Sequence, residues 1–402
     1  MPFDVMRVRS FYPALEEGFV HFDGAAGTLV AEPVARAIGR VLRGAVANRT
    51  TAFEPGRRAL RILDGAREAV ADLVGGEPGG IVFGPSATAL TYTVARSLAD
   101  TWRPGDNVVV SRLDHDANVR PWVQHAQRAG VTVRWAGFDV GTGALPTERY
   151  GELVDDRTRL VAVTAASNAI GTRPDVAAVA AIAHAAGALV YVDGVHSTPH
   201  LPTDITALGA DFYVTSAYKW SGPHLAACAA TPERWAGLGT DKLVPSPDAA
   251  PERFELGTPS FELLAGVQAA VEFLGTLDDT AAGSRRERVL TSLVAAHRHE
   301  MGLFETLLDG LRALPSVRIL PAPSGPLQGC PTVSFRVGDQ HPAETSAALG
   351  DEGVCVFAGD YYAYEYFQAM GLRDTGGAVR AGIYHYTTAA DVDRLLTAVR
   401  SL

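Results

Sequence analysis

Two residues of opposite charge, Asp193 and Lys219, each follow a short apolar run and are the first candidates for chemistry. The runs, at 188–192 and 211–215, are β-rich and bounded by Gly, Ser or Asp, which is typical of buried parallel strands. In open parallel sheets, ligands bind beyond the carboxyl ends of the strands. The sequence therefore predicts one carboxylate and one amine at the same crevice.

Lys219 stands between Tyr218 and Trp220 and not among charged residues. Most lysines are exposed, but a lysine between aromatic side chains is partly desolvated, which lowers its pKa and favours Schiff-base chemistry. Asp193 needs a partner if it lies at the end of a buried strand. A backbone N–H group could serve, but with Lys219 26 positions later we favour a protonated pyridine nitrogen, which a carboxylate keeps charged.

Two turns add further candidates. The turn at 84–88, GPSAT, joins a predicted strand to a helix whose first N–H groups could bind a phosphate, although Ser and Thr also merely cap helices. It is neither a Walker loop nor a GxGxxG, which argues against a nucleotide. In the second turn, His115 either begins a helix, held by Asp114, or stacks on a bound aromatic ring. His196 and His200 are four positions apart, but Pro199 disfavours a helix between them and no metal is expected.

Strands and helices alternate from position 80 onward, which predicts an α/β fold with a mostly parallel seven-stranded sheet covered on both faces. The expected strands are 80–83, 107–111, 131–135, 160–164, 188–192, 211–215 and 226–229, and the expected helices are 32–45, 56–73, 86–100, 117–129 and 176–186. The rest reads as a smaller α+β domain, with helices at 261–277, 284–314 and 390–401 and strands at 317–320, 332–337 and 355–357. We therefore predict an N-terminal arm at 1–20 (helix 6–17) packing with the small domain, a large domain at 21–259 and a small domain at 260–402.

Size and charge limit the possible partners. The chain has 402 residues, 47% hydrophobic and 20% charged, and a net charge of −10, which argues against nucleic acid as a partner. Its three cysteines, Cys228, Cys330 and Cys355, are odd in number and widely spaced, so neither a disulfide framework nor a zinc site is predicted. No signal sequence or apolar run of about 20 residues occurs, so we expect a cytoplasmic protein without a membrane partner.

Five segments in order carry a family resemblance: GPSATALT, RLDHDANV, YVDGVH, SAYKWSGPH and DYYAYE. With them the chain resembles, over nearly its whole length, fold-type-I enzymes that use pyridoxal 5′-phosphate (PLP). Specifically, it resembles the class V aminotransferase and cysteine desulfurase family, in its cysteine desulfurase-like branch. The resemblance implies PLP as cofactor, an amino-acid substrate and a homodimer with a shared active site.

The resemblance also implies roles for single residues. Lys219 would form the Schiff base, Asp193 would pair with the pyridine nitrogen, and His115 would stack on the ring. The other implied cofactor contacts are Asn168 and His196 near the phenolic oxygen, Ser216, Thr88 and Ala87 at the phosphate, Tyr218 beside Lys219, and Thr258 reaching the phosphate of a partner subunit. Relatives often have a hydroxyl in place of Ala87, so one phosphate contact is expected to be absent. Arg380 would clamp the substrate α-carboxylate, and Ala25, Asn48, Tyr361 and Tyr362 would line the substrate site.

One departure from the family bears on the reaction. The mobile persulfide cysteine of the family falls in a loop that here reads 357–363, where tyrosine takes the matching place. Cys355 lies nearby in an apolar run and is expected to be buried and inert. We therefore expect C–S bond cleavage by β-elimination, with Lys219 as base. Cysteine desulfuration, transamination, epimerisation and decarboxylative chemistry stay as alternatives, as does a non-catalytic PLP-binding partner protein.

Overall fold

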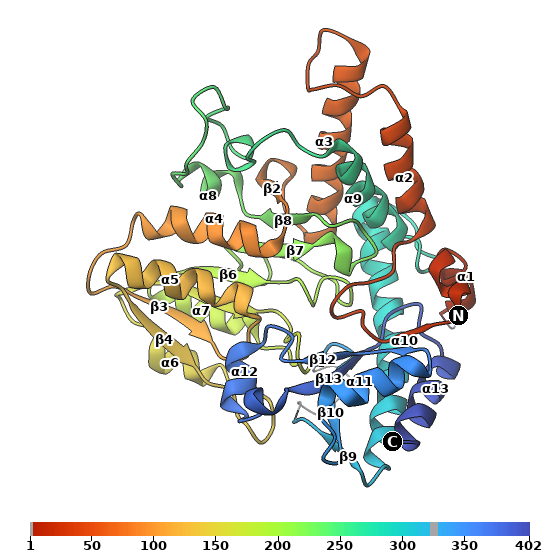
Figure 1. Cartoon of the computed structure of the whole chain (residues 1–402). Coiled ribbons are helices and arrows are strands. Elements are labelled where there is room, and N and C mark those ends of the chain that lie inside the picture. Colours follow the sequence, from red (N-terminus) through yellow and green to blue (C-terminus); the bar gives the residue numbers. More distant parts are fainter. Residues whose placement is uncertain (1–2, 322–328) are drawn as a thin grey trace.

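A seven-stranded sheet forms the centre of the molecule. The computed structural model describes residues 3–321 and 329–402 (Figure 1). From one edge to the other, the strands are β2 (Ile81–Gly84), β8 (Ala226–Ala229), β7 (Phe212–Ser216), β6 (Leu189–Asp193), β5 (Thr158–Thr164), β3 (Asn107–Ser111) and β4 (Thr132–Ala136). This confirms the predicted α/β fold with a mostly parallel central sheet.

Strand direction brings several strand ends to one edge of this sheet. Strands β7, β6, β5, β3 and β4 run parallel, and β8 is antiparallel to both β7 and β2. The carboxyl ends of β3, β5, β6 and β7 therefore meet at the same edge. These are the ends that carry Ser111, Thr164, Asp193 and Ser216.

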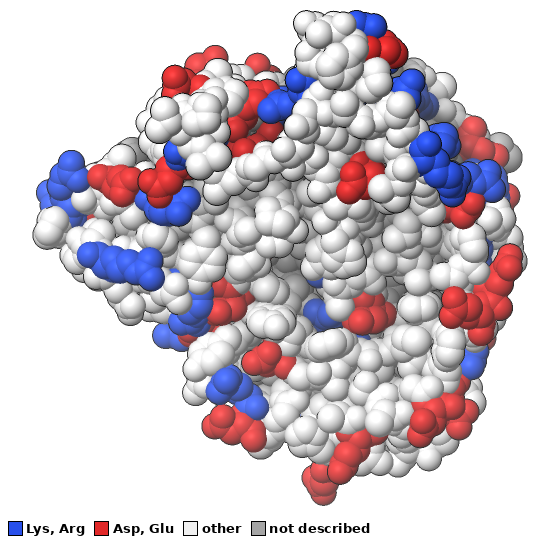
Figure 2. Space-filling model, turned by 45° about the horizontal axis from the view of Figure 1, so that its top comes forward, with Lys and Arg blue, Asp and Glu red and all other residues white. Residues whose placement is uncertain are grey.

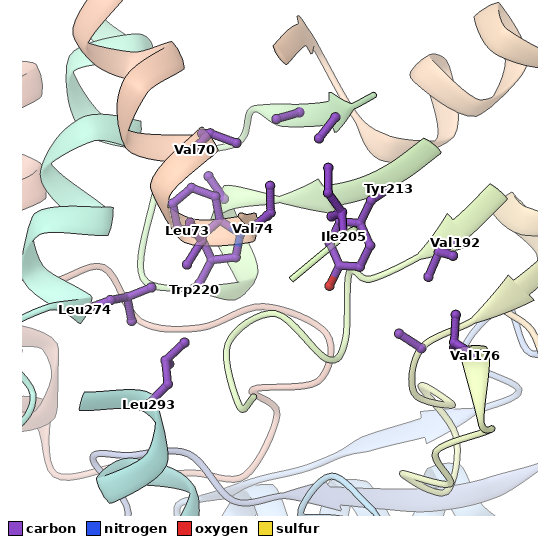
Figure 3. Packing of buried hydrophobic residues seen from close by; sticks show 14 of the residues in the cluster. Val70, Leu73, Val74, Val176, Val192, Ile205, Tyr213, Trp220, Leu274 and Leu293 are labelled. Carbon is purple, nitrogen blue, oxygen red and sulfur yellow. The ribbon is translucent and has the colours of Figure 1, made fainter. Parts of the chain in front are cut away.

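Helices cover both faces of the sheet because strand residues alternate between the faces. Val108 and Val110 belong to the hydrophobic cluster under helices α4 (Ala87–Ala99) and α5 (Arg120–Ala129). Val109 belongs to the cluster on the opposite face, together with residues of α3 (Glu54–Val74) and α7 (Val176–Ala185). Trp220, which follows Lys219, packs into the second cluster near Leu73 and Val74, as Figure 3 shows. The neighbour of the candidate lysine is thus fixed in the core.

A second sheet lies in the C-terminal part of the chain. It is antiparallel, in the order β12 (Phe357–Gly359), β13 (Ala378–Gly382), β10 (Thr332–Val337) and β9 (Val317–Ile319). Helices α10 (Arg285–Arg312), α11 (Pro342–Asp351) and α13 (Ala389–Arg400) share a hydrophobic cluster with it. A short parallel pair, β1 (Val20–His21) with β11 (Val354–Cys355), joins the N-terminal segment to this part.

The remaining helices lie around these two sheets. Helix α9 (Phe261–Leu274) packs against α2 (Glu32–Arg43) and α3. The short helices are α1 (Val5–Arg9), α6 (Glu148–Leu153), α8 (Pro232–Ala236) and α12 (Tyr364–Ala369). The N-terminal segment contacts the end of the chain, since Arg9 pairs with Asp391 at 2.8 Å and Tyr12 Oη lies 2.6 Å from His385 Nε2.

Three predicted elements are wrong in detail. The helix expected at 6–17 is interrupted before Pro13, which disfavours helical geometry at Tyr12, and only a 3₁₀ turn follows. The helix expected at 117–129 begins as α5 at Arg120, and Pro121 occupies its first turn. The strand expected at 355–357 is two strands, β11 and β12, which belong to different sheets.

The surface carries both signs of charge. Figure 2 shows acidic and basic side chains interspersed around one face, with a hollowed and largely uncharged area in its middle. Among the described residues, no helix combines the length and the apolar character that crossing a membrane requires.

Candidate active site

Asp193 ends strand β6 and is 6% exposed. Its Oδ1 accepts a hydrogen bond from the N–H group of Val195 at 2.9 Å. Burial raises the pKa of Asp193 to about 6, although the Val195 N–H group and the Lys219 ammonium act in the opposite direction. A cationic partner on the open side of this carboxylate would bring the pKa down again.

Lys219 follows strand β7 in a 3₁₀ turn and is 8% exposed. Its Nζ donates a hydrogen bond to the carbonyl of Ala25 and lies 5.4 Å from the centre of the Tyr218 ring. Burial and the charge of Arg380 lower the pKa of Lys219 to about 7, against the opposing effects of Asp193 and Asp23. A lysine with this pKa is about half in the neutral amine form near neutral pH, and this form is the one that nucleophilic and base chemistry require.

Two connected cavities open beside these residues. The inner cavity is lined by Ser86, Ala87, Thr88, His115, Ala117, Thr164, Ala166, Asn168, Asp193, Val195, His196, Ser216, Tyr218 and Lys219. The outer cavity, about 620 Å³, is lined by Ala25, Ala26, Thr88, Tyr92, His115, Asp116, Ala117, Arg120, Asn168, Tyr218, Lys219, Phe357, Tyr361, Tyr362 and Arg380. Both cavities are lined by Thr88, His115, Ala117, Asn168, Tyr218 and Lys219, so the two cavities form one site.

The N-terminus of helix α4 forms one wall of the inner cavity. Ser86 caps this helix by accepting the N–H group of Ala89 at 3.1 Å. The first N–H groups of a helix, here those of Ala87 and Thr88, have no acceptor within the helix and carry its positive dipole end. Ser216, 2% exposed at the end of β7, lines the same cavity. Ser86 was not among the predicted site residues, although its place in the GPSAT turn was visible.

His115 lies across the inner and outer cavities. Burial, then Lys219 and Arg380, lower its pKa to about 3, so the imidazole is neutral near pH 7. Its Nδ1 accepts the N–H group of Ala117 at 3.0 Å, which assigns the proton to Nε2. The expectation that Asp114 could hold His115 is wrong. Asp114 instead accepts hydrogen bonds from Ser111 and from Asn118, the latter at 2.6 Å.

Asn168 and His196 lie at the side of the inner cavity. Asn168 Nδ2 donates to the carbonyl of Tyr361 at 2.9 Å, and the buried Asn168 Oδ1 has no hydrogen-bond partner among the described residues. His196 Nε2 lies 3.0 Å from Thr332 Oγ1, and burial holds the pKa of His196 well below its usual value. Both side chains thus present neutral polar groups to a ligand.

Arg380, on strand β13, is 2% exposed at the wall of the outer cavity. Its Nη1 donates to the carbonyl of Asn168 at 2.9 Å, and its Nη2 lies 3.5 Å from Asp23 Oδ1. The Tyr361 ring lies 4.5 Å from the guanidinium carbon. Asp23 was not predicted as a site residue. Of the turn that contains it, only Ala25 was among the predicted site residues.

The tyrosines Tyr361 and Tyr362 complete the outer wall. Tyr361 is 5% exposed, whereas Tyr362 is 72% exposed and its ring centre lies 5.5 Å from that of His115. Both have positive φ angles, of 50° and 58°. This cavity is also lined by Tyr92, Asp116, Arg120 and Phe357. These residues were not predicted, because only tertiary packing brings them to the cavity.

Two predicted site residues lie elsewhere in the single chain. Thr258 lines a separate cavity of about 360 Å³ with Leu256 and Pro85, and Asn48 is exposed and lines neither cavity of the site. Arg49 pairs with Glu252 at 3.7 Å, so the two loops that carry Asn48 and Thr258 are neighbours. Asn48 and Thr258 therefore lie in one surface region, which is separate from Lys219 of the same chain.

The residues of the inner cavity fit PLP. Free helix N–H groups and Ser216 suit a phosphate, and the buried Asp193 carboxylate suits a pyridine nitrogen. The unpartnered Asn168 Oδ1 and Arg380 Nε are buried polar atoms that a ligand could satisfy. Among the described residues, no group of His, Cys, Asp and Glu is arranged to hold a metal ion.

Comparisons with known proteins agree with this geometry. The family model for class V aminotransferases matches residues 20–395. Uncharacterized protein MT3887 of Mycobacterium tuberculosis is 38% identical over the full length of both chains. A probable cysteine desulfurase of Pseudomonas aeruginosa is 33% identical over 98% of this chain and 97% of its own.

A solved structure shows the same fold. The crystal structure of the cysteine desulfurase CsdA from Escherichia coli, in an S-sulfonic acid form, has a TM-score of 0.86 and 27% identity. The match covers 100% of this chain and 98% of CsdA. Because the family model spans most of the chain and both of these relatives exceed 30% identity over nearly its whole length, the chain belongs to the class V aminotransferase family and is a PLP-dependent enzyme.

Proposed function

We propose that this enzyme cleaves the C–S bond of a cysteine-derived or S-conjugated L-amino acid by β-elimination. One observation carries the proposal: among the described residues that line the two cavities, none is a cysteine, and the wall beside Arg380 presents Tyr361 and Tyr362. Transfer of sulfur to the protein would need a thiolate at this place. Elimination releases the sulfur as a free thiol and needs none.

The three cysteines support this choice. Cys228 and Cys330 are fully buried, and burial raises the pKa of Cys330 to about 12. Cys355 is half-buried in strand β11, and burial raises its pKa as well. A thiol whose pKa is raised is a poor nucleophile at neutral pH.

Arg380 would bind the substrate α-carboxylate. Its guanidinium reaches the outer cavity, and planar N–H donors suit a carboxylate. Holding the carboxylate there orients the Cα–H bond of the substrate toward Lys219, which lines the same cavity.

Lys219 would act as the base. PLP, when bound, supplies an electron sink for the electron pair left on Cα. The neutral Lys219 amine takes the Cα proton, the Cβ–S bond breaks with its electron pair on sulfur, and the proton on Lys219 is available to the leaving thiolate. With one water, an S-conjugate of L-cysteine gives the free thiol, pyruvate and ammonia, so atoms and electrons balance without an oxidant.

A second copy of the chain would complete the site. Asn48 and Thr258 lie on neighbouring exposed loops, and the same region exposes the apolar side chains Leu256 (67%) and Phe53 (49%). These two exposed apolar side chains are available to pack against a second copy of the chain. We propose a homodimer in which these loops reach the partner's inner cavity.

The test uses the purified PLP-loaded enzyme and a panel of L-cysteine S-conjugates. We expect equal amounts of thiol and pyruvate, identified by mass spectrometry, and unchanged turnover in Cys355→Ala. Cysteine desulfuration is the second candidate, because relatives carry that name. It would give alanine from L-cysteine and would be lost in Cys355→Ala, and this result would overturn the lyase proposal.

A further inference from the structure

Three residues of the outer cavity contact one another in a closed circuit. Arg380 Nη1 donates to the carbonyl of Asn168, Asn168 Nδ2 donates to the carbonyl of Tyr361, and the Tyr361 ring covers Arg380. We propose that Tyr361 is a positioning residue, which holds the Arg380 guanidinium in the orientation that receives a substrate carboxylate. The inference rests on the role of Arg380 in the proposed function, and not on the fate of the substrate.

The geometry of the contact supports this role. The Tyr361 ring lies 4.5 Å from the guanidinium carbon, whereas the Phe357 ring lies at 6.0 Å. All five guanidinium N–H groups point outward in the plane of the group. A ring that covers the guanidinium carbon therefore limits rotation of the group and leaves the N–H donors that do not bond to Asn168 or Asp23 available to a carboxylate. The unpartnered Arg380 Nε shows that this edge has unused donor capacity among the described residues.

The backbone of Tyr361 is held in an unfavourable conformation. Its φ angle is 50°, and that of Tyr362 is 58°, a left-handed region that residues other than glycine rarely adopt. Such strain persists only where surrounding contacts impose it. Here the Tyr361 hydroxyl donates to the Ala378 carbonyl, and the Tyr362 carbonyl accepts the N–H group of Asp116 at 2.7 Å. The left-handed turn lets one residue direct its ring to Arg380 and its carbonyl to Asn168.

The segment after the tyrosines is also fixed. Glu365 is 7% exposed and pairs with Arg112 at 2.8 Å and with Arg120. Arg120 pairs in turn with Asp116 at 2.7 Å. Ion pairs with a buried member resist solvent screening better than exposed ones. The segment that follows Tyr361 is thus held by ion pairs around the buried Glu365, as a fixed wall requires.

The test measures preference for a carboxylate without C–S bond cleavage. L-2-Aminobutyrate has no leaving group at Cβ, and propylamine is the same molecule without the carboxylate. Dissociation constants for both are obtained from the change in cofactor absorbance of the PLP-loaded enzyme, and their ratio is the carboxylate preference. Tyr361→Asn tolerates the left-handed backbone and keeps the carbonyl but removes the ring. Tyr361→Phe keeps the ring.

We expect the preference to fall about tenfold in Tyr361→Asn and to stay within about twofold of wild type in Tyr361→Phe. The spectrum without amine should be unchanged in both variants, because Asn168 is bonded to the Tyr361 backbone. Should Tyr361→Asn not fold, Tyr361→Leu, which keeps the bulk without an aromatic face, should show the same fall. A preference that persists at the wild-type value in the ring-less variant overturns the inference.

Tyr366 offers a matched control. It is a fully buried tyrosine five positions later, stacked on Phe138 at 4.8 Å, and it lines neither cavity. Tyr366→Leu should lower the melting temperature and leave the carboxylate preference unchanged. If Tyr366→Leu loses as much preference as Tyr361→Asn, the role of Tyr361 is structural and the inference is overturned. Equal binding of both amines by the wild-type enzyme would instead overturn the role of Arg380. Absence of C–S cleavage alone would overturn neither.

Discussion

The inner and outer ends of the site are built in different ways. At the inner end, Asp193 and Ser216 end adjacent parallel strands and Lys219 follows the second strand, so sheet geometry brings them together. At the outer end, Asp23, Asn168, Tyr361 and Arg380 come from separate segments, joined by side-chain hydrogen bonds and a ring contact.

This difference separates what is general from what is particular in the site. Strand ends in a sheet are held by many cooperative backbone bonds, and the cofactor chemistry that they support is shared by a whole family. The outer wall depends on a few side chains, and single substitutions there can change which bond of the substrate is presented to Lys219. We therefore expect changes at the inner end to abolish chemistry and changes at the outer end to alter substrate binding.

The largest effect is expected at Lys219. Lys219→Ala removes both the covalent attachment of the cofactor and the base, so turnover should fall at least about 10³-fold. The chain has only one other lysine, Lys242, which pairs with the exposed Asp248 and lies outside both cavities. Borohydride reduction followed by peptide mass spectrometry should label Lys219 alone, and Lys242→Ala should retain full turnover. Label on Lys242 would contradict the assignment of the inner end.

The second largest effect is expected in the pH dependence of the free energy of unfolding. It arises from Asp114, which is buried next to the inner end of the site. Burial raises the pKa of Asp114 to about 7, from a usual value of about 4. Because the folded state favours the protonated form, this contribution to stability is fully present below about pH 4 and is lost as the pH rises through 7. Over this window it amounts to about 4 kcal/mol.

Asp114→Asn isolates that contribution. Asparagine keeps one oxygen for the Asn118 donor, presents an N–H group to the Ser111 hydroxyl oxygen, and does not titrate. Denaturant unfolding of both proteins at pH 4 and pH 8 should show a larger loss of stability in wild type, by about the same 4 kcal/mol. Parallel pH profiles would mean that Asp114 is ionised in the folded protein throughout.

At the outer end, Arg380→Lys should weaken substrate binding more than it slows chemistry. Lysine keeps the charge but cannot offer two parallel donors to a carboxylate. We expect KM for an L-amino-acid substrate to rise about 100-fold, with kcat changing far less. Steady-state kinetics with the product assay measure both constants. A fall in kcat with unchanged KM would place Arg380 in the chemical step and blur the contrast between the two ends.

The sequence predicted the inner end better than the outer end for a physical reason. Short apolar runs and small-residue turns are local signals, and they located Asp193, Lys219 and the start of α4 to within one residue. Arg380 and Tyr361 were found only through the family resemblance. Their contacts with Asp23 and Asn168 join residues more than 190 positions apart, and no local pattern encodes such pairs.

Errors in the predicted elements have similar causes. The short strand β13, which carries Arg380, was missed because its identity depends on pairing with β10 and β12. Pro13 is a visible signal against a continuous helix, because a proline disfavours helical geometry in the residue before it. The predicted boundary at 259/260 stays a prediction, and helix α9, which follows it, packs against α2 and α3.

The smallest effect concerns Thr258, which belongs to neither end within one chain. If a second copy supplies it to the phosphate, Thr258→Val should weaken PLP binding about tenfold, whereas the exposed Thr306→Val should not. A mixed dimer of Lys219→Ala and Thr258→Val chains then decides where Thr258 acts. Across an interface, one of its two sites combines an intact Lys219 with an intact Thr258 and binds PLP with wild-type affinity. Within a chain, each site carries one defect, and a mixed dimer without any wild-type site would contradict the shared active site.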